Sequence, residues 1–374
     1  MWLRYGAVVV FAVRLTVLGS LNMDISVAVA SLPVPGATVL GGAAVFAPGG
    51  KGANQAVAAA RLGVGAGLSV QMVGCVGDDD FGRTLRATLR AEGVEDSAVR
   101  TVADLPTGIA MITVDQAGEN TIAVAPGANR EVGPAEIAAA SEVIAPREKA
   151  VAHEKASADE GTVPLERAAE VLVISAEIPV PAIRAALDAS LVAGAPATIR
   201  VLNLAPAPPE AAELVAAHPD WLVVNESEAA AVLGRPVAGL ADAAHAAADL
   251  VAAGARNAVV TAGAAGAAYC GPHGTGPADD ASDDGAQTRG SGRCTQLTVP
   301  GFKVRAVDTV GAGDTFVGAL AVALAAGVRP ADAVTAAAAA GATAATRPGT
   351  QSGMPSPADI LAATGYPWPV PPKE

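Results

Sequence analysis

The feature that most constrains the fold is the alternation of short β-branched runs with long alanine-rich stretches of helical period. The strand-like runs are Leu15–Gly19, Ser69–Val73, Ala110–Val114, Val171–Ser175, Trp221–Val224 and Ala258–Thr261. The helix-like stretches are Asn54–Arg61, Gly82–Glu92, Pro181–Ala193, Glu226–Leu233, Leu240–Ala253, Asp314–Ala326 and Pro330–Ala345. Strands and helices that alternate in this way form βαβ units. The sequence therefore predicts an α/β fold with a doubly wound, mostly parallel sheet flanked by helices.

Composition agrees with this fold. Aromatic residues are only 3% of the 374 residues, so the core must consist mainly of Ala, Val, Leu and Ile. Such a core suits helices packed on a buried parallel sheet. Hydrophobic residues at 51% and charged residues at 16% exclude general disorder. We predict one large domain over residues 13–366.

Two regions interrupt the alternation and predict a small β-sheet lid. Residues 25–46 and 107–125 are extended and contain Gly and Pro but no helical stretch. Within the second region, Ile109–Asp115 and Thr121–Ala125 flank a turn and predict a hairpin. Two further segments, the charged residues 147–166 and the low-complexity residues 271–293, are interpreted as insertions.

Charge, cysteines and the N-terminus limit the classes of partner. The net charge is −13 and no basic block is present, so we expect no nucleic-acid partner. The apolar N-terminal segment is interrupted by Arg14 and is too short to span a membrane, so residues 1–12 are interpreted as an extension of a cytoplasmic protein without a membrane partner. Cys75, Cys270 and Cys294 share no CxxC spacing, and we expect reduced thiols.

The sharpest motif is Val307–Phe316. Its Gly311-Ala312-Gly313 turn opens directly into an apolar helix, and the amides of such a turn add to the positive end of the helix dipole. Asp314 follows in the first turn, beside this anion pocket. Amides that stabilise a phosphoryl group and a carboxylate that removes a proton are what phosphoryl transfer requires. The spacing alone also fits a tight turn with Asp314 as a capping residue.

A second glycine-rich motif, Ala47–Gln55, opens the first alanine-rich helix. It is not a P-loop, because Gly52 rather than Ser or Thr follows Lys51. Glycines let a ligand approach the backbone, and Lys51 and Asn54 could hydrogen-bond a polyol. The alternative is a glycine-rich connection with a solvated lysine.

Polar residues also follow three of the predicted strands. Asn22 and Asp24 follow the first strand, Glu177 follows Val171–Ser175, and Asn225 with Glu228 follows Trp221–Val224. Ligands of open α/β sheets gather at the carboxyl ends of strands. These side chains therefore predict one crevice, with carboxylates and amides suited to Mg²⁺ held through water. Each residue alone also fits a helix cap.

These motifs together carry a resemblance to a known family. The chain resembles the ribokinase-like carbohydrate kinases in Leu18–Asp24, Gly49–Gly63, Pro106–Asn129, Asn225–Glu228, Val307–Phe316 and Thr346–Pro355. The resemblance implies an α/β kinase with a β lid that phosphorylates the 5-hydroxyl of D-ribose with ATP. It also implies a homodimer formed through the lid strands.

The resemblance further implies a role for each matching residue. Asp314 would be the catalytic base, and the amides of Gly311, Ala312 and Gly313 would form the anion hole. The sugar would be held by Asn22, Asp24, Gly50, Lys51, Asn54 and Glu177. Asn225 and Glu228 would act around Mg²⁺ and the phosphates, and Thr261, Gly263, Gly266 and Gly313 would bind the nucleotide. A monovalent cation, usually potassium, would be bound by Asp308, the carbonyls of Val310, Ala344 and Gly349, and the segment at Gly353, where the family often has serine.

Three alternatives remain at this point. The first is the same chemistry on another sugar or on a nucleoside. The second is a non-catalytic sugar-binding protein, against which the presence of Asp314, the glycine turn and Lys51 argues. The third is a dehydrogenase, which is disfavoured because no GxGxxG motif follows the first strand.

Overall fold

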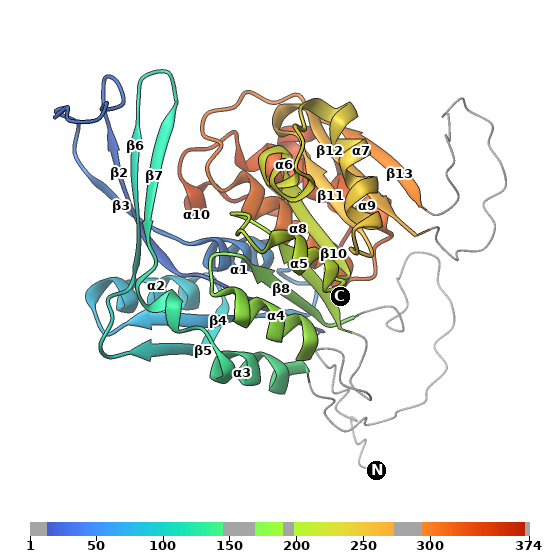
Figure 1. The fold of residues 1–374 in the computed structure, drawn as a ribbon, viewed down its shortest axis with the longest axis horizontal. Helices are drawn as coiled ribbons and strands as arrows, with labels where there is room; N and C mark the ends of the chain where they lie inside the picture. The colour runs from blue at the N-terminus through green and yellow to red at the C-terminus, as the bar shows by residue number, and fades with distance from the viewer. Residues whose placement is uncertain (1–12, 145–168, 190–197, 273–293, 371–374) are drawn as a thin grey trace, which may run out of the picture.

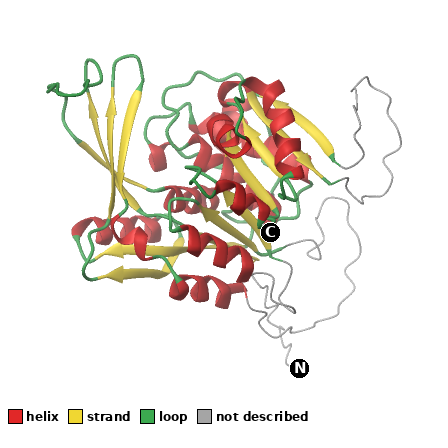
Figure 2. Ribbon diagram, in the orientation of Figure 1, coloured by secondary structure: helices red, strands yellow, loops and turns green. Residues whose placement is uncertain are grey.

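The computed structural model describes residues 13–144, 169–189, 198–272 and 294–370. The predicted extension, residues 1–12, and the predicted insertion at 147–166 lie outside these residues, as does nearly all of 271–293. The described chain contains one large sheet with helices on both faces and one smaller sheet (Figures 1 and 2).

The large sheet has nine strands in the order β13-β12-β11-β10-β9-β8-β1-β4-β5. Its strands are β1 (Val13–Leu18), β4 (Leu68–Gly77), β5 (Val94–Val102), β8 (Val171–Ser175), β9 (Ile199–Asn203), β10 (Trp221–Asn225), β11 (Ala258–Thr261), β12 (Gly266–Gly271) and β13 (Thr295–Pro300). All pairs from β5 through β11 are parallel, whereas β12 and β13 pair antiparallel at one edge. The predicted fold class is therefore confirmed.

Alternate residues of each central strand enter two different cores. In β8, Val171 and Val173 pack on one face of the sheet, and Leu172 and Ile174 pack on the other. The first face is covered by α1 (Lys51–Leu62), α2 (Asp80–Ala91), α8 (Ala312–Ala325), α9 (Pro330–Ala344) and α11 (Pro357–Thr364). The second is covered by α3 (Pro134–Ile144), α4 (Val180–Ala189), α5 (Ala211–Ala216), α6 (Glu226–Leu233) and α7 (Gly239–Ala252). Because both faces are covered, apolar residues predominate on both faces of these strands.

Helices α1 and α8 cross with their backbones in close contact, and this crossing positions the site. A Cβ atom added to Gly318 of α8 would lie 2.8 Å from the Gln55 carbonyl oxygen and 2.8 Å from the Ala58 Cβ atom of α1. Only small residues permit this approach. Since Asp314 lies one turn before Gly318, the crossing brings the first turns of both helices together.

The smaller sheet forms the lid. It consists of β2 (Asn22–Ala28), β3 (Val45–Gly49), β6 (Gly108–Val114) and β7 (Asn120–Ala125) in the order β3-β2-β6-β7. Strands β6 and β7 form an antiparallel hairpin, as the sequence predicted. The lid stands away from the large sheet and borders the carboxyl ends of its strands (Figure 1).

The cysteines correct one prediction. Cys270 and Cys294 form a disulfide, with Cα atoms 6.0 Å apart, so the expectation of reduced thiols is wrong for this pair. The antiparallel pairing of Gly271 with Thr295 brings the two cysteines together, and no local spacing in the sequence reveals it. Cys75 is a buried free thiol. Among the described helices, none is long and apolar enough to cross a membrane.

Candidate active site

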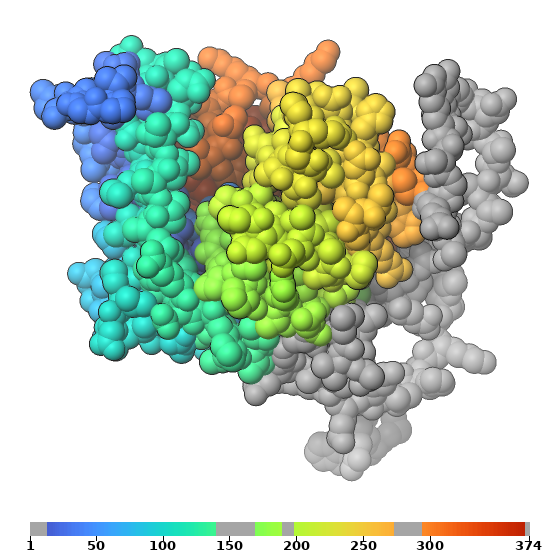
Figure 3. All heavy atoms as spheres, in the orientation of Figure 1, coloured from blue at the N-terminus to red at the C-terminus, as the bar shows by residue number. Residues whose placement is uncertain are grey.

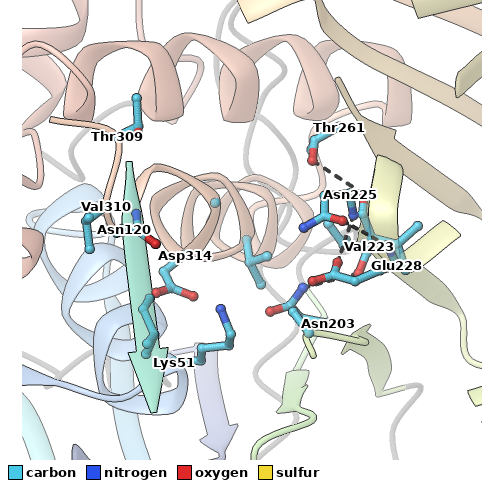
Figure 4. Close-up of a pocket in the computed structure, with 16 residues that line it drawn as sticks. Lys51, Asn120, Asn203, Val223, Asn225, Glu228, Thr261, Thr309, Val310 and Asp314 are labelled. Atoms are coloured by element: carbon cyan, nitrogen blue, oxygen red, sulfur yellow. Dashed lines mark hydrogen bonds between the residues drawn. The ribbon is translucent and has the colours of Figure 1, made fainter. Parts of the chain in front are cut away.

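A cavity of about 310 Å³ lies between the lid and the carboxyl ends of β9, β10 and β11. Figure 3 shows this hollow between the lid and the body of the protein, with the C-terminal helices behind it. The cavity is lined by Lys51, Asn120, Ile122, Asn203, Ala205, Val223, Val224, Asn225, Glu228, Thr261, Thr309, Val310, Gly311, Gly313, Asp314 and Val317 (Figure 4). Its volume falls within the range of small-molecule sites.

Asp314 stands at the start of α8 and is held on both oxygens. Its side chain accepts from Asn54 Nδ2 at 2.8 Å on Oδ2 and from Gln55 Nε2 at 3.1 Å on Oδ1. The residue is 7% exposed, and this small exposed part faces the cavity. A carboxylate with one remaining acceptor site on each oxygen can take a proton from a hydroxyl group bound in the cavity.

The turn before Asp314 presents free amides to the cavity. Gly311 adopts a left-handed conformation with φ of 78°, which only glycine adopts easily. The amides of Gly311 and Gly313 donate to no acceptor in the described part of the chain. The Ala312 amide, in contrast, donates to the Thr309 carbonyl at 3.2 Å. Two glycine amides without an acceptor among the described residues therefore stand beside the cavity at the positive end of α8.

Lys51 lies opposite Asp314 in the cavity (Figure 4). The negative charge of Asp314 raises the pKa of the Lys51 ammonium, with further contributions from Glu177, Glu228 and Asp24. Lys51 therefore stays protonated and is the positive charge at the centre of an acidic group of side chains.

The glycines beside Lys51 have a structural reason that the sequence did not reveal. A Cβ atom added to Gly49 would lie 2.1 Å from the Asp24 carboxylate. One added to Gly50 would lie 2.6 Å from the backbone nitrogen of Asn22, and one added to Gly52 would lie 2.7 Å from the backbone of Gly19. These glycines let the start of α1 pack directly on the β1–β2 segment. They bring Lys51 close to Asn22 and Asp24.

Glu177 anchors the start of α1. Its Oε2 atom accepts from the Ser20 hydroxyl at 2.6 Å and from the Lys51 amide at 3.2 Å. Glu177 therefore has a capping role, and its second oxygen remains available to a ligand.

Asn22 and Asp24 project from the first lid strand, on the same face of β2. Asn129 Nδ2 donates to Asn22 Oδ1 at 2.8 Å, which occupies the acceptor of the Asn22 amide and leaves its nitrogen as a donor. Burial, together with the charges of Glu177 and Asp314, raises the pKa of Asp24 to about 7, although the charge of Lys51 opposes this shift. Asp24 is therefore a carboxyl group that changes protonation near neutral pH.

Asn225 and Glu228 form a capping box at the start of α6. The Glu228 amide donates to Asn225 Oδ1 at 2.9 Å, and the Asn225 amide donates to Glu228 Oε2 at 2.8 Å. Both side chains also line the cavity, and burial raises the pKa of Glu228. The helix-cap alternative is thus correct for this pair, and it leaves one Glu228 oxygen for a ligand.

The segments predicted to bind a monovalent cation lie next to each other. Asp308 accepts from the Val310 amide at 3.0 Å and from the Gly349 amide at 2.9 Å. The Val307 and Asp308 amides both donate to the Ala345 carbonyl. Asp308 therefore ties the loop before α8 to the loop that follows α9.

Several predicted residues do not line the cavity. Thr261 lines it, whereas the predicted nucleotide residues Gly263 and Gly266 do not. Of the predicted sugar-binding residues, Lys51 and Asp314 line the cavity; the others, which do not, are Asn22, Asp24, Gly50, Asn54 and Glu177. Gly266, with φ of 117°, is required where β12 starts, because an added Cβ atom would lie 2.0 Å from the Val299 carbonyl. Ala344, Gly349 and Gly353 lie behind the cavity, in α9 and in α10 (Thr350–Gly353) with its N-cap. Among the described residues, no group of three or more His, Cys, Asp or Glu side chains could hold a metal ion.

Comparison with known proteins identifies the family. The model of the pfkB family carbohydrate kinases matches residues 13–357. The chain belongs to the pfkB family of carbohydrate kinases. The predicted resemblance and the predicted ATP-dependent sugar kinase are therefore confirmed.

Similar proteins align with this pfkB-family kinase over nearly their whole length. The ribokinase of Schizosaccharomyces pombe is 33% identical over 349 residues, which are 92% of this chain and 95% of that protein. The ribokinase structure from Thermotoga maritima has 29% identity and a TM-score of 0.68, covering 94% of this chain and 98% of that one. The structure of the Arabidopsis thaliana ribokinase complexed with ribose and ATP has 25% identity and a TM-score of 0.69, covering 95% and 99%.

Sequence reasoning missed four amide side chains of this pfkB-family site. Gln55, Asn203 and Gln351 surround Asp314 and Asn54, and Asn129 holds Asn22. Asn203 ends a buried strand, so the rule that singled out Asn225 could have found it. Gln55, Gln351 and Asn129 carry no such signal, because they are buried and meet their partners only in the folded chain.

Proposed function

We propose that the protein transfers the γ-phosphoryl group of ATP to the 5-hydroxyl of D-ribose, giving ribose 5-phosphate and ADP. The observation that carries this proposal is the placement of the Asp314 carboxylate beside the free amides of Gly311 and Gly313 in one cavity. The similarity to ribokinases over most of both chains supports ribose as the sugar.

In this reaction, Asp314 accepts the proton of the sugar hydroxyl as the oxygen bonds to the γ-phosphorus. The bond from this phosphorus to the oxygen bridging it to the β-phosphate breaks, and ADP leaves with that oxygen. The Gly311 and Gly313 amides stabilise the charge on the transferred group. Lys51, held protonated by its acidic neighbours, adds a positive charge beside the same centre.

Hydrogen-bond donors and acceptors at the base of the lid hold the sugar. Asn22 supplies a donor because Asn129 occupies its acceptor oxygen. Asp24 and the free oxygen of Glu177 supply acceptors, and the backbone at Gly50 closes the site. Asn54 uses one amide hydrogen on Asp314 and keeps the second for a sugar hydroxyl.

Asn225 and Glu228 are assigned to Mg²⁺, and Thr261, Gly263 and Gly266 to the nucleotide. The donor set fits the metal, because the Glu228 oxygen that is free of the capping box is a hard ligand at the wall of the cavity. When bound, Mg²⁺ neutralises charge on the phosphates. A bound cation would also offset the burial that raises the pKa of Glu228.

Potassium is assigned to the two loops that Asp308 joins, the loop before α8 and the loop that follows α9. The carboxylate and the carbonyls of Val310, Ala344 and Gly349 are oxygen ligands on segments already held together. Gly353 supplies no side-chain ligand. We expect activity in potassium chloride to exceed activity in choline chloride of equal ionic strength, and Asp308→Ala to remove that difference. Equal activity of the unmodified protein in both salts would refute this assignment.

The activity is tested by measuring ADP formation with ribose, ATP, Mg²⁺ and K⁺, and by identifying the product. Asp314→Asn is expected to lower kcat by about 10²- to 10⁴-fold. Asp332→Asn is a matched control, because Asp332 is also the third residue of its helix but lies outside the cavity. Retained activity in Asp314→Asn would refute the assignment of the base. Activity on another pentose, a hexose or a nucleoside, but not on ribose, would refute the substrate.

A homodimer through the lid is also proposed. Phe46 and Met111 are 56% and 55% exposed and share one face of the lid sheet, since each is paired with Ile25. Ile122 and Val124 are exposed on the opposite face, from which Ile122 lines the cavity. Apolar side chains exposed in this number favour a protein contact. Sedimentation should give a dimer, and Met111→Glu should weaken it; a monomer at micromolar concentration would refute this proposal.

We propose a cytoplasmic location, because ATP is a substrate supplied inside cells. The disulfide between Cys270 and Cys294 is a bond more common in oxidising compartments. Fractionation of cells that express the tagged chain, with the kinase found in the membrane or secreted fraction, would refute the location.

A further inference from the structure

A chain of four amide side chains leads to Asp314 from two sides, and of these four the mechanism above uses only Asn54. Asn203 Nδ2 donates to the Val223 carbonyl at 3.2 Å, and Gln55 Nε2 donates to Asn203 Oδ1 at 2.8 Å. The same Gln55 nitrogen donates to Asp314 Oδ1. On the other side, Gln351 Nε2 donates to Asn54 Oδ1 at 3.0 Å, and Asn54 Nδ2 donates to Asp314 Oδ2.

Each amide in this chain has only one possible orientation. The Val223 carbonyl can only accept, so Asn203 must turn its nitrogen towards it and its oxygen towards Gln55. Gln55 must then turn its nitrogen towards Asn203, and the Asp314 carboxylate requires a donor as well. A backbone carbonyl in the middle of the sheet therefore fixes the direction of Asn203 and Gln55. The Asp314 carboxylate, which can only accept, fixes Asn54 and then Gln351.

Packing alone does not account for a glutamine at position 55. Gln55 is fully buried, and its Oε1 atom accepts no hydrogen bond from the described residues. An unsatisfied buried oxygen costs roughly 1–3 kcal/mol, which an apolar side chain would avoid. The residues that follow Gln55 in α1, from Ala56 to Ala60, are alanine and valine, which fill the core without polar groups.

We infer that Gln55 is a positioning residue for phosphoryl transfer, which aligns the Asp314 carboxylate through its fixed amide. The inference rests on the proposed function. With Gln55 on one oxygen and Asn54 on the other, the carboxylate cannot rotate without breaking a hydrogen bond. One acceptor site on each oxygen stays directed to the cavity. Because Gln55 is fully buried, it acts on the base and not on the sugar.

The test is Gln55→Met, which keeps the length of the side chain and removes the donor. We expect kcat to fall about tenfold to a hundredfold, as for a misaligned catalytic group, while KM for ribose stays within about threefold. Gln71→Met is the matched control. Gln71 is also buried with an unpaired Oε1 among the described residues, and it lies in β4 outside the cavity. Its kcat should be unchanged.

Each outcome has one meaning. A folded Gln55→Met protein with unchanged kcat, or with a raised KM and unchanged kcat, overturns the inference. If Gln55→Met does not fold, Gln55→Leu replaces it, because leucine also removes the donor to Asp314 and suits the apolar core around position 55. A fall in kcat for Gln55→Leu with KM for ribose nearly unchanged supports the inference, and an unchanged kcat overturns it. Inactive unmodified protein would instead refute the proposed function.

Discussion

Asp24 should release a proton when the sugar binds. Burial, together with the charges of Glu177 and Asp314, raises its pKa from 3.8 to about 7. A carboxyl group with this pKa is about half protonated at pH 7. Sugar hydroxyls that donate to the carboxylate favour the ionised form, so binding at pH 7 should release about half a proton.

The same pKa sets the pH dependence of sugar affinity. If only the ionised form binds, Kd rises by a factor of one plus the ratio of protonated to ionised Asp24. That factor is about 11 at pH 6, about 2 at pH 7 and about 1.1 at pH 8, for a pKa of about 7. Affinity should therefore fall steeply below pH 7 and change little above pH 8.

Calorimetry in two buffers measures the proton directly. Phosphate and Tris have very different ionisation enthalpies, so the difference in binding enthalpy at pH 7 gives the number of protons released. Asp24→Asn should bind ribose weakly and show no dependence on the buffer. A binding enthalpy that is equal in both buffers for the unmodified protein, with tight binding, would refute the reasoning.

Asp24 also makes the folded state sensitive to pH. Because its pKa is raised on folding, the folded state binds the proton more tightly than the unfolded chain does. This contribution to stability is fully present below about pH 4 and is lost as pH rises through about 7. Asp24→Asn should therefore raise Tm more at pH 8 than at pH 5. An equal change at both values would show that Asp24 is not buried as described.

Three further predictions concern the supports of the site. Gly318→Ala should lower the free energy of unfolding by roughly 1–3 kcal/mol, because its Cβ atom would collide with α1. Gly313 lies in the same helix, and a Cβ atom added to it would have no atom within 4 Å. Gly313→Ala should therefore leave the stability nearly unchanged and lower kcat by roughly tenfold or more. If Gly313→Ala and Gly318→Ala lost equal stability, the close crossing of the helices would be contradicted. Asn129→Asp should raise KM for ribose with less effect on kcat, because two facing oxygens would turn the Asn22 amide; an unchanged KM would contradict this orientation. Reduction of the disulfide between Cys270 and Cys294 should lower the free energy of unfolding by roughly 3 kcal/mol, because the unfolded chain would lose a cross-link between residues 24 positions apart. Peptide mapping without reductant should recover the two cysteines as a linked pair.

The sequence by itself determined the fold class and the centre of the site. Alternating runs of strand and helix character predict a parallel sheet, because period and length are local properties of the chain. The glycine turn before Asp314 is local in the same sense, since a left-handed residue at a helix start can be recognised from a few neighbouring residues. Lys51 and Asn225 were found by similar rules.

Only the tertiary structure decided how these residues are supported. Gln55 and Asp314 are 259 positions apart, and Gln351 and Asn54 are 297 apart, so their hydrogen bonds depend on the crossing of α1 and α8 and on the position of α10. The same is true of the disulfide, which follows from the pairing of β12 with β13. Buried amides, and a pKa such as that of Asp24, arise from surroundings contributed by distant segments. A local pattern carries no information about such surroundings, because they exist only once the sheet and its helices have packed.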